Sequence, residues 1–110
     1  MRRDVFQAIA DPIRREIIDI LSQEGESNLH NLISHFQVSR PAIAKHVRIL
    51  KECGLVVIEK QGREQRCRPQ LEKLGELALW VHQYRRFWNT RLDRLETLLK
   101  EENDFDKKNK

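Results

Sequence analysis

The chain has 110 residues, which is enough for one domain with a modest hydrophobic core. Its 21 Lys and Arg residues outnumber its 17 Asp and Glu residues, and the net charge of +4 permits an anionic partner without requiring one. No segment approaches the roughly 20 apolar residues that span a bilayer, and the first residues lack the apolar run of a signal peptide. Two cysteines, Cys53 and Cys67, suit a reducing compartment. We therefore expect a cytoplasmic protein without a membrane partner.

The first two predicted helices are separated by a capping signal. Apolar residues at helical spacing predict a short helix over residues 4–10. Asp11 is a favoured N-cap residue, and Pro12 fits the first position of the next helix, where its missing N–H costs nothing. This second helix is predicted to continue to about Ser22.

A second pair of short helices follows, joined by a tight turn. Residues 29–36 carry apolar side chains at positions i, i+3, i+4 and i+7, and either Ser27 or Asn28 caps this helix. Ser39 is predicted to cap the fourth helix. That helix ends at Gly54, because glycine is typical of the position after a helix C-terminus.

The periodicity changes after the fourth helix. Residues 55–60 are rich in β-branched side chains and predict a strand, residues 61–64 predict a turn, and residues 65–69 predict a second, more polar strand. A long helix is then predicted over residues 74–100. The polar residues 101–110 predict a disordered C-terminal tail.

This order of elements predicts the fold class. Two short helices joined by a tight turn and followed by a β-hairpin form a winged helix-turn-helix, an α+β fold that is mainly α with a small β-hairpin. We expect about five helices and a two-stranded wing. Residues 1–100 are predicted to form one domain for DNA binding and dimerisation.

The fourth helix has an outer face suited to a DNA groove. On a helical wheel its apolar residues cluster on one side. The other side carries Pro41, Lys45, Arg48 and Glu52, with Ala44 at the edge. Arg40 lies at the start of the helix. Arg and Lys can donate to guanine O6 and N7, and small residues can contact the thymine methyl group. The alternative interpretation is an ordinary solvated face.

The predicted hairpin is rich in basic residues. Lys60, Arg63, Arg66 and Arg68 lie on it with only two acidic residues. A basic hairpin beside a recognition helix can contact phosphates. The alternative is a sheet edge that is protected from aggregation by charge.

Two arginines lie where the helix dipole disfavours them. Arg14 and Arg15 occupy the first turn of the second helix, near the positive end of its dipole. A phosphate bound at this position would explain both residues. The alternative is an ion pair within the chain, with Glu16 or Asp19.

Two segments resemble the ArsR/SmtB family of bacterial repressors: FQAIADPIRR at residues 6–15 and VSRPAIAKHVRIL at residues 38–50. The wing residues Gly62 and Arg63 follow in the expected order, and the resemblance covers nearly the whole chain. It implies a homodimer built on the first and last helices, an operator with two-fold symmetry, and repression that a signal relieves. The chain departs from the family at Ile13, which replaces the usual small polar residue, and in a second wing strand without an aromatic residue.

The predicted DNA-binding residues combine these three basic regions. They are Arg14, Arg15, Ser39, Arg40, Pro41, Ala44, Lys45, Arg48, Lys60, Arg63 and Arg66.

The last predicted helix carries a cluster of four large aromatic side chains within nine residues. A chain of this size cannot easily bury them alone, so we expect a second copy of the chain to cover them. An effector pocket between the two copies is the competing interpretation. The predicted dimer-interface residues are Val5, Phe6, Ile9, Trp80, Val81, Tyr84, Phe87, Trp88, Leu92, Leu95 and Leu99.

The metal sites that the resemblance implies are not matched. The third helix contains no cysteine pair, and His30 and His35 are five residues apart, on different sides of the helix. The last helix has only His82 and lacks the second histidine of the family's other site. Cys53 and Cys67 would form a metal or redox site only if the fold brings them together. We predict neither a metal nor a cofactor.

One further histidine, His46, lies on the fourth helix near its buried face. We expect a packed and hydrogen-bonded side chain there, not one that reads bases.

The sequence therefore predicts a DNA-binding transcriptional regulator, a homodimeric repressor without the family's usual metal sites. Its predicted partners are pseudo-palindromic double-stranded DNA, a second copy of the chain and an unidentified small-molecule effector. Two alternatives remain: a metal- or redox-responsive repressor that uses Cys53 and Cys67, and a winged-helix module that binds protein and not DNA. We predict no enzymatic activity, because the sequence contains neither a phosphate-binding loop nor a nucleophile with a base at motif spacing.

Overall fold

The computed structural model describes residues 3–108, and of residues 88, 90, 92 and 103–108 it describes the backbone alone. The chain divides into two compact units, Met1–Leu77 and Ala78–Lys110. We describe each unit by itself.

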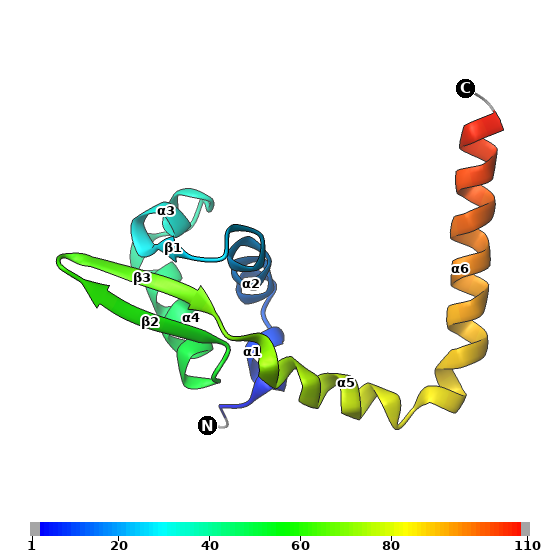
Figure 1. Ribbon diagram of the computed structural model, residues 1–110, viewed down its shortest axis with the longest axis horizontal. Coiled ribbons are helices and arrows are strands. Elements are labelled where there is room, and N and C mark those ends of the chain that lie inside the picture. Colours follow the sequence, from blue (N-terminus) through cyan, green and yellow to red (C-terminus); the bar gives the residue numbers. More distant parts are fainter. Residues whose placement is uncertain (1–2, 109–110) are drawn as a thin grey trace. The chain divides into compact units, whose positions relative to one another are not determined.

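Four α-helices form most of the first unit (Figure 1). They are α1 (Val5–Ile9), α2 (Pro12–Glu24), α3 (Leu29–Ser34) and α4 (Arg40–Glu52). Each begins at a side chain that accepts a hydrogen bond from a backbone N–H of the first turn. The capping residues are Asp4, Asp11, Asn28 and Ser39. The predicted caps at Asp11 and Ser39 are confirmed, and Asn28 caps the third helix.

A three-stranded antiparallel sheet completes the first unit, in the order β1-β3-β2. Its strands are β1 (Ser27–Asn28), β2 (Val56–Gln61) and β3 (Glu64–Pro69). The predicted wing strands are present, but β1 is an additional strand that pairs Ser27 with Cys67 and Asn28 with Arg66. Two residues are too few to produce a period-2 pattern, which is why sequence analysis did not find β1.

Glycines allow two of the turns that place the wing. Gly54 follows α4 with a φ of +82°, as predicted for the residue that ends this helix. Gly62 has a φ of +64° in the two-residue turn between β2 and β3, and Arg63 follows it without a positive φ. This is the pattern of a type II′ turn, whose twist suits a hairpin.

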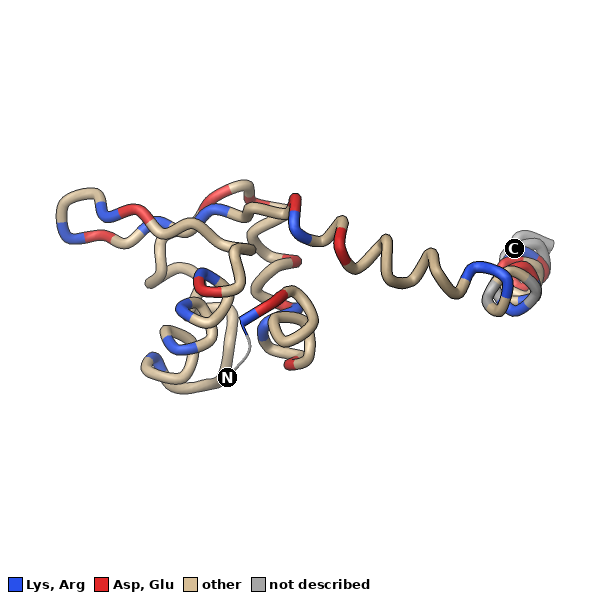
Figure 2. The backbone as a smooth tube through the Cα atoms, turned by 90° about the horizontal axis from the view of Figure 1, so that it is seen from below, with Lys and Arg blue, Asp and Glu red and all other residues tan. Residues whose placement is uncertain are grey.

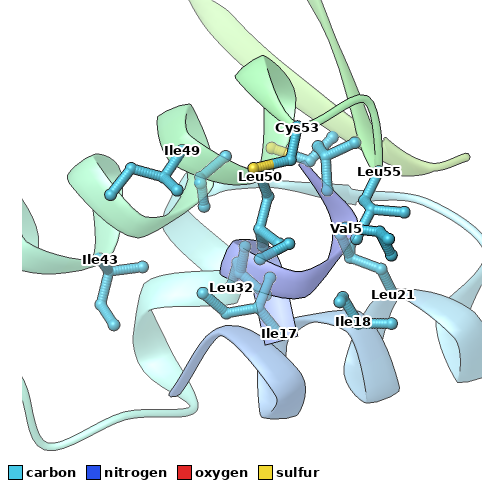
Figure 3. Packing of buried hydrophobic residues seen from close by; sticks show 14 residues of the cluster. Val5, Ile17, Ile18, Leu21, Leu32, Ile43, Ile49, Leu50, Cys53 and Leu55 are labelled. Carbon is cyan, nitrogen blue, oxygen red and sulfur yellow. The ribbon is translucent and has the colours of Figure 1, made fainter. Parts of the chain in front are cut away.

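The core of the first unit is formed by aliphatic residues from α1, α2, α3, α4 and the start of β2 (Figure 3). Leu21, Leu32 and Leu50 have no exposed surface. Burying a leucine side chain contributes about 1.5–3 kcal/mol, so these contacts fix α4 firmly by its inner face. Its outer face is therefore held in a defined orientation.

The C-terminal part differs from the single helix predicted over residues 74–100. A short 3-10 helix, η1 (Leu71–Lys73), precedes α5 (Leu74–His82) and α6 (Arg85–Lys108). Hydrogen bonds from Tyr84 N–H to Val81 O and from Phe87 N–H to Tyr84 O span three residues, which marks a tightened turn between the two helices. A disordered tail was predicted at residues 101–110. The structure continues α6 through residues 101–108, and the last two residues lie outside the described chain. None of the described helices combines the length and apolar character that crossing a bilayer requires.

Candidate nucleic-acid interface

The two faces of α4 separate as predicted. Ile43 and Val47 are buried in the core, whereas Pro41, Lys45 and Arg48 are exposed. Figure 2 shows basic residues at intervals along α4 and near the tip of the β2–β3 hairpin. The helix therefore presents a basic outer face on a rigid support.

A groove of about 480 Å³ lies between the start of α3, the start of α4 and the hairpin. The residues that line it are Asn28, Leu29, His30, Arg40, Lys60, Arg63, Glu64 and Gln65. Within the described part of the chain, no ion pair neutralises Arg40, Lys60 or Arg63. The groove, which we call the basic groove, therefore has an excess of positive charge.

A second groove of about 270 Å³ runs between α4 and the sheet. Its lining includes Ala44, Arg48 and Lys51, and it shares Leu29 and Gln65 with the basic groove. The two grooves therefore adjoin, and the basic side chains of α4 and of the hairpin border one continuous surface.

Two hairpin arginines have acidic partners within the chain. Nε of Arg66 donates to Glu26 Oε1 at 2.5 Å, and Nη1 of Arg66 lies 3.7 Å from Glu64 Oε2. Nη2 of Arg68 donates to Glu59 Oε1 at 2.5 Å. In the absence of DNA, Arg66, which was predicted to hold phosphate, joins the wing to the segment before β1.

The predicted phosphate contact of Arg14 is corrected by the structure. Its side chain is buried, with 9% of the residue exposed. Nε donates to Ala8 O at 3.0 Å, and Nη2 donates to Gln7 O at 2.9 Å. Arg14 therefore stabilises the C-terminal end of α1, where the helix dipole favours a cation.

Arg15 contacts the same helix end. Its Nη1 donates to Ile9 O at 2.6 Å, although the residue remains exposed. Neither predicted intramolecular partner, Glu16 or Asp19, forms an ion pair with Arg14 or Arg15 among the described residues. The backbone carbonyl groups of α1 are the partners of both arginines.

A polar junction connects α4 to this helix end. Nη1 of Arg14 lies 3.2 Å from Nδ1 of half-buried His46, and a guanidinium can only donate. The expected packed and hydrogen-bonded role of His46 is confirmed.

The N-cap of α2, Asp11, is affected by the same arginine. Partial burial alone would raise the pKa of Asp11, but hydrogen bonds from Arg14 N–H and Ile13 N–H and the nearby positive charges hold this pKa below the ordinary 3.8.

Both cysteines are free and buried in the core cluster. Burial raises the pKa of the Cys67 thiol. It also raises that of Cys53, where the charges of Arg3 and Arg14 oppose the effect only in part. A raised pKa leaves less of the nucleophilic thiolate. Among the residues that the structure describes, no three His, Cys, Asp or Glu side chains gather to hold a metal ion.

The predicted dimer-interface residues have different surroundings in the two units. Val5 is 1% exposed and belongs to the core, which corrects its assignment to an interface. Ile9 is half-buried against that core, whereas Phe6 is exposed. The predicted interface residues of the second unit with described side chains are all exposed: Trp80, Val81, Tyr84, Phe87, Leu95 and Leu99. The side chains of Trp88 and Leu92 lie outside the described residues.

The aromatic residues of the second unit contact one another and an arginine. The rings of Trp80 and Tyr84 meet edge to face, with centroids 5.3 Å apart. The guanidinium carbon of Arg91 lies 4.8 Å from the centroid of the Phe87 ring, within the range of a cation–π contact. These contacts order an apolar surface that remains open to solvent.

Sequence analysis missed two polar residues of the basic groove, Asn28 and His30. The pairing of β1 with β3 brings the start of α3 beside the wing (Figure 1). A general signal was present, since the first helix of a helix-turn-helix pair crosses the DNA backbone. The sequence did not indicate which residues of that helix meet the wing.

A helix-turn-helix with a basic outer face, followed by a basic hairpin on the same surface, defines a winged helix DNA-binding protein. The model of the bacterial regulatory protein arsR family matches residues 11–57. The transcriptional repressor SdpR of Bacillus subtilis is 37% identical over 60 residues, which cover 54% of this chain and 66% of SdpR.

Two solved structures extend the likeness. An ArsR-like transcriptional regulator from Rhodococcus sp. RHA1 is 35% identical, with a TM-score of 0.63 over 86% of this chain and 88% of that one. The homodimeric winged helix-turn-helix DNA-binding domain Mb0332 from Mycobacterium bovis is 27% identical, with a TM-score of 0.59 over 71% of each chain. The chain belongs to the ArsR family of bacterial transcriptional regulators, as its resemblance to that family predicted.

Proposed function

We propose that the chain is a homodimeric transcriptional repressor that binds a pseudo-palindromic operator in double-stranded DNA. The observation that carries the proposal is the basic groove, in which Arg40, Lys60 and Arg63 line one cavity beside the outer face of α4. No carboxylate among the described residues pairs with these three cations. They are therefore available to phosphate groups.

The residues of α4 divide into those that permit approach and those that make contacts. Ser39, Pro41 and Ala44 are small and let the helix enter the major groove closely. Lys45 and Arg48 lie on the exposed face, where they reach base edges. Lys60 and Arg63 on the wing hold phosphates and fix the register.

Self-association is supported by large exposed side chains in the second unit. Leu79, Trp80, Val81, Phe87 and Leu98 are 45% to 69% exposed. Apolar clusters of this kind mark protein interfaces. The Mycobacterium bovis relative is described as homodimeric. Two copies of α4 would enter successive major grooves about 34 Å apart.

The protein would act on its DNA in the cytoplasm, a reducing compartment in which the free thiols of its two cysteines persist. A redox or metal response through Cys53 and Cys67 is not part of it. Both residues are buried, and the pKa of each thiol is raised.

The test is binding to a fluorescently labelled duplex that carries the DNA upstream of the protein's own coding region. Anisotropy should show tighter binding to this duplex than to a mixed-sequence duplex of equal length, with two protomers bound. Binding should weaken as salt rises. Equal affinity for both duplexes, or affinity independent of salt, would contradict the proposal and favour a module that binds protein.

A matched pair of wing variants locates the contact. Arg63→Ala should reduce the slope of log affinity against log salt by about 1.8 for the dimer, because each of the two protomers loses one phosphate contact worth about 0.9. Arg68→Ala on the same hairpin should leave the slope unchanged, since Arg68 is paired with Glu59.

A promoter–reporter fusion tests whether the protein represses or activates transcription. If it is a repressor, expression of the reporter should be higher with Arg40→Ala than with the unchanged protein.

A further inference from the structure

We propose that the basic groove takes up a proton together with a DNA phosphate, and that His30 is the residue that binds this proton. The inference rests on the proposed function, because it describes how the same surface holds the DNA backbone. It assigns His30 a phosphate contact that depends on pH.

The position of His30 supports this role. It is exposed in the first turn of α3 and lines the basic groove together with Arg40 of α4 and Arg63 of the wing. The β1–β3 pairing at Asn28 and Arg66 holds the start of α3 against the wing. His30 therefore faces the space in which a phosphate would be clamped.

The charges around the groove determine the direction of the effect. Arg40 faces it from α4, Lys60 from β2, and Arg63 from the hairpin turn, whereas Glu64 of β3 is the only carboxylate in the lining. Glu64 also lies 3.7 Å from Arg66, which offsets part of its charge. A phosphate bound in the groove adds negative charge beside His30 and favours its protonated form. Phosphate binding and proton uptake are therefore coupled.

Histidine is suited to this coupling because its charge changes between about pH 5 and pH 8. The chain offers a matched control in His35. This residue lies just after α3, outside the groove lining, with its Nε2 3.3 Å from Glu24 Oε1. Of the other two histidines, His46 contacts Arg14 and does not line the groove, and His82 lies in α5.

The experiment measures affinity for a fluorescently labelled mixed-sequence DNA duplex, since phosphate contacts carry no sequence information. For the unchanged dimer, which has two copies of His30, the slope of log affinity against log salt should be steeper by about 1.8 near pH 6 than near pH 8, or about 0.9 for each protomer. A fourfold rise in salt would then reduce the affinity about twelvefold more at the lower pH.

Three variants identify the group. His30→Gln should remove the difference between the two pH values, and His30→Lys should give the steeper slope at both. His35→Gln should keep the difference. Thermal unfolding checks that each variant is folded, which exposed positions favour.

Failure of this inference and failure of the proposed function give different results. No salt-sensitive binding to any duplex at either pH would contradict the function itself. Binding with the same salt slope at both pH values, or a difference that persists in His30→Gln, would overturn the inference and leave the function standing. Loss of the difference in His35→Gln would overturn it as well.

Discussion

The first turns of α2 and α4 are built alike and serve different purposes. Each helix begins at a polar N-cap, Asp11 or Ser39, and each has a proline in its first turn with no acidic residue there. Each also carries arginine where the helix dipole disfavours it. In α2 the guanidinium of Arg14 is buried, whereas in α4 Arg40 is exposed and lines the basic groove.

The difference arises from what lies in front of each helix. The last carbonyl groups of α1 lie within reach of the arginines of α2, so the positive charge of Arg14 and Arg15 meets the negative end of another helix. Arg40 instead borders a groove whose other cations come from the wing. An arginine in a first turn therefore indicates an anionic partner, which can be either a helix end or a nucleic acid.

Among the variants of the two first turns, Arg14→Ala should have the largest effect on the free energy of unfolding. Arg14→Ala leaves the carbonyl oxygen of buried Ala8 without its guanidinium donor, whereas Gln7 O still accepts from Ala10 N–H. A buried unsatisfied acceptor costs about 1–3 kcal/mol, so we expect the free energy of unfolding to fall by about that amount in urea titrations followed by circular dichroism. Arg40→Ala is the matched control and should change it by less than about 0.5 kcal/mol. Equal losses in the two variants would show that the two first turns are not distinguished by burial.

Lys45→Ala should change DNA recognition and not stability, which is the reverse of the effect expected for Arg14→Ala. It is exposed, so Lys45→Ala should leave the stability within about 0.5 kcal/mol of the unchanged protein. A side chain that reads a base edge contributes about 1–3 kcal/mol of discrimination, so the preferred operator sequence should change. Selection of bound duplexes from a randomised pool measures this preference. A uniform loss of affinity with unchanged preference would make Lys45 a phosphate contact.

The elements that sequence analysis predicted correctly depend on local rules. The caps at Asp11 and Ser39, the end of α4 at Gly54 and the inward stripe of Ile43 and Val47 each follow from a few neighbouring residues. The basic groove was predicted in part on the same grounds, through the exposed arginine and lysine residues of α4 and the hairpin.

The contacts that sequence analysis did not predict join distant segments of the chain. The partners of Arg14 come from the end of α1, and the principal partner of Arg66 is Glu26, 40 positions away. Val5 belongs to the core because the helices around it enclose it. His30 joins the groove through a two-residue strand that has no sequence signature. Periodicity along one segment contains no information on such pairings.

Removing the N-cap of either helix should have a smaller effect on the free energy of unfolding, and for Asp11 this effect depends on pH. Asp11→Ala and Ser39→Ala should each lower the free energy of unfolding by about 1 kcal/mol near neutral pH, because each removes an N-cap acceptor. The pKa of Asp11 is lowered in the folded protein, so its ionised carboxylate stabilises the fold above the ordinary pKa of 3.8. That contribution is lost as the pH falls through the lowered pKa.

The two caps should therefore separate in acid. The cost of Asp11→Ala should shrink on acidification, whereas the cost of Ser39→Ala should not, since a serine hydroxyl does not titrate in this range. Asp11→Asn keeps a cap acceptor at every pH and should remove only the pH-dependent part. Urea titrations at a series of pH values measure these differences, and parallel curves for the two alanine variants would contradict the assignment.

The smallest expected effect concerns the wing, where Arg66 and Arg63 repeat the contrast between an internal and an external partner. Arg66→Ala breaks an exposed ion pair with Glu26, which contributes about 0.2–1 kcal/mol to stability. Its DNA affinity and salt slope should remain those of the unchanged protein, because its charge is already used within the chain. Arg63→Ala should leave the stability unchanged and lower the salt slope of the dimer by about 1.8, since each protomer loses one phosphate contact. Measuring both quantities in both variants is necessary, because a salt slope that falls in Arg66→Ala would show that DNA displaces Glu26 and recruits this arginine on binding.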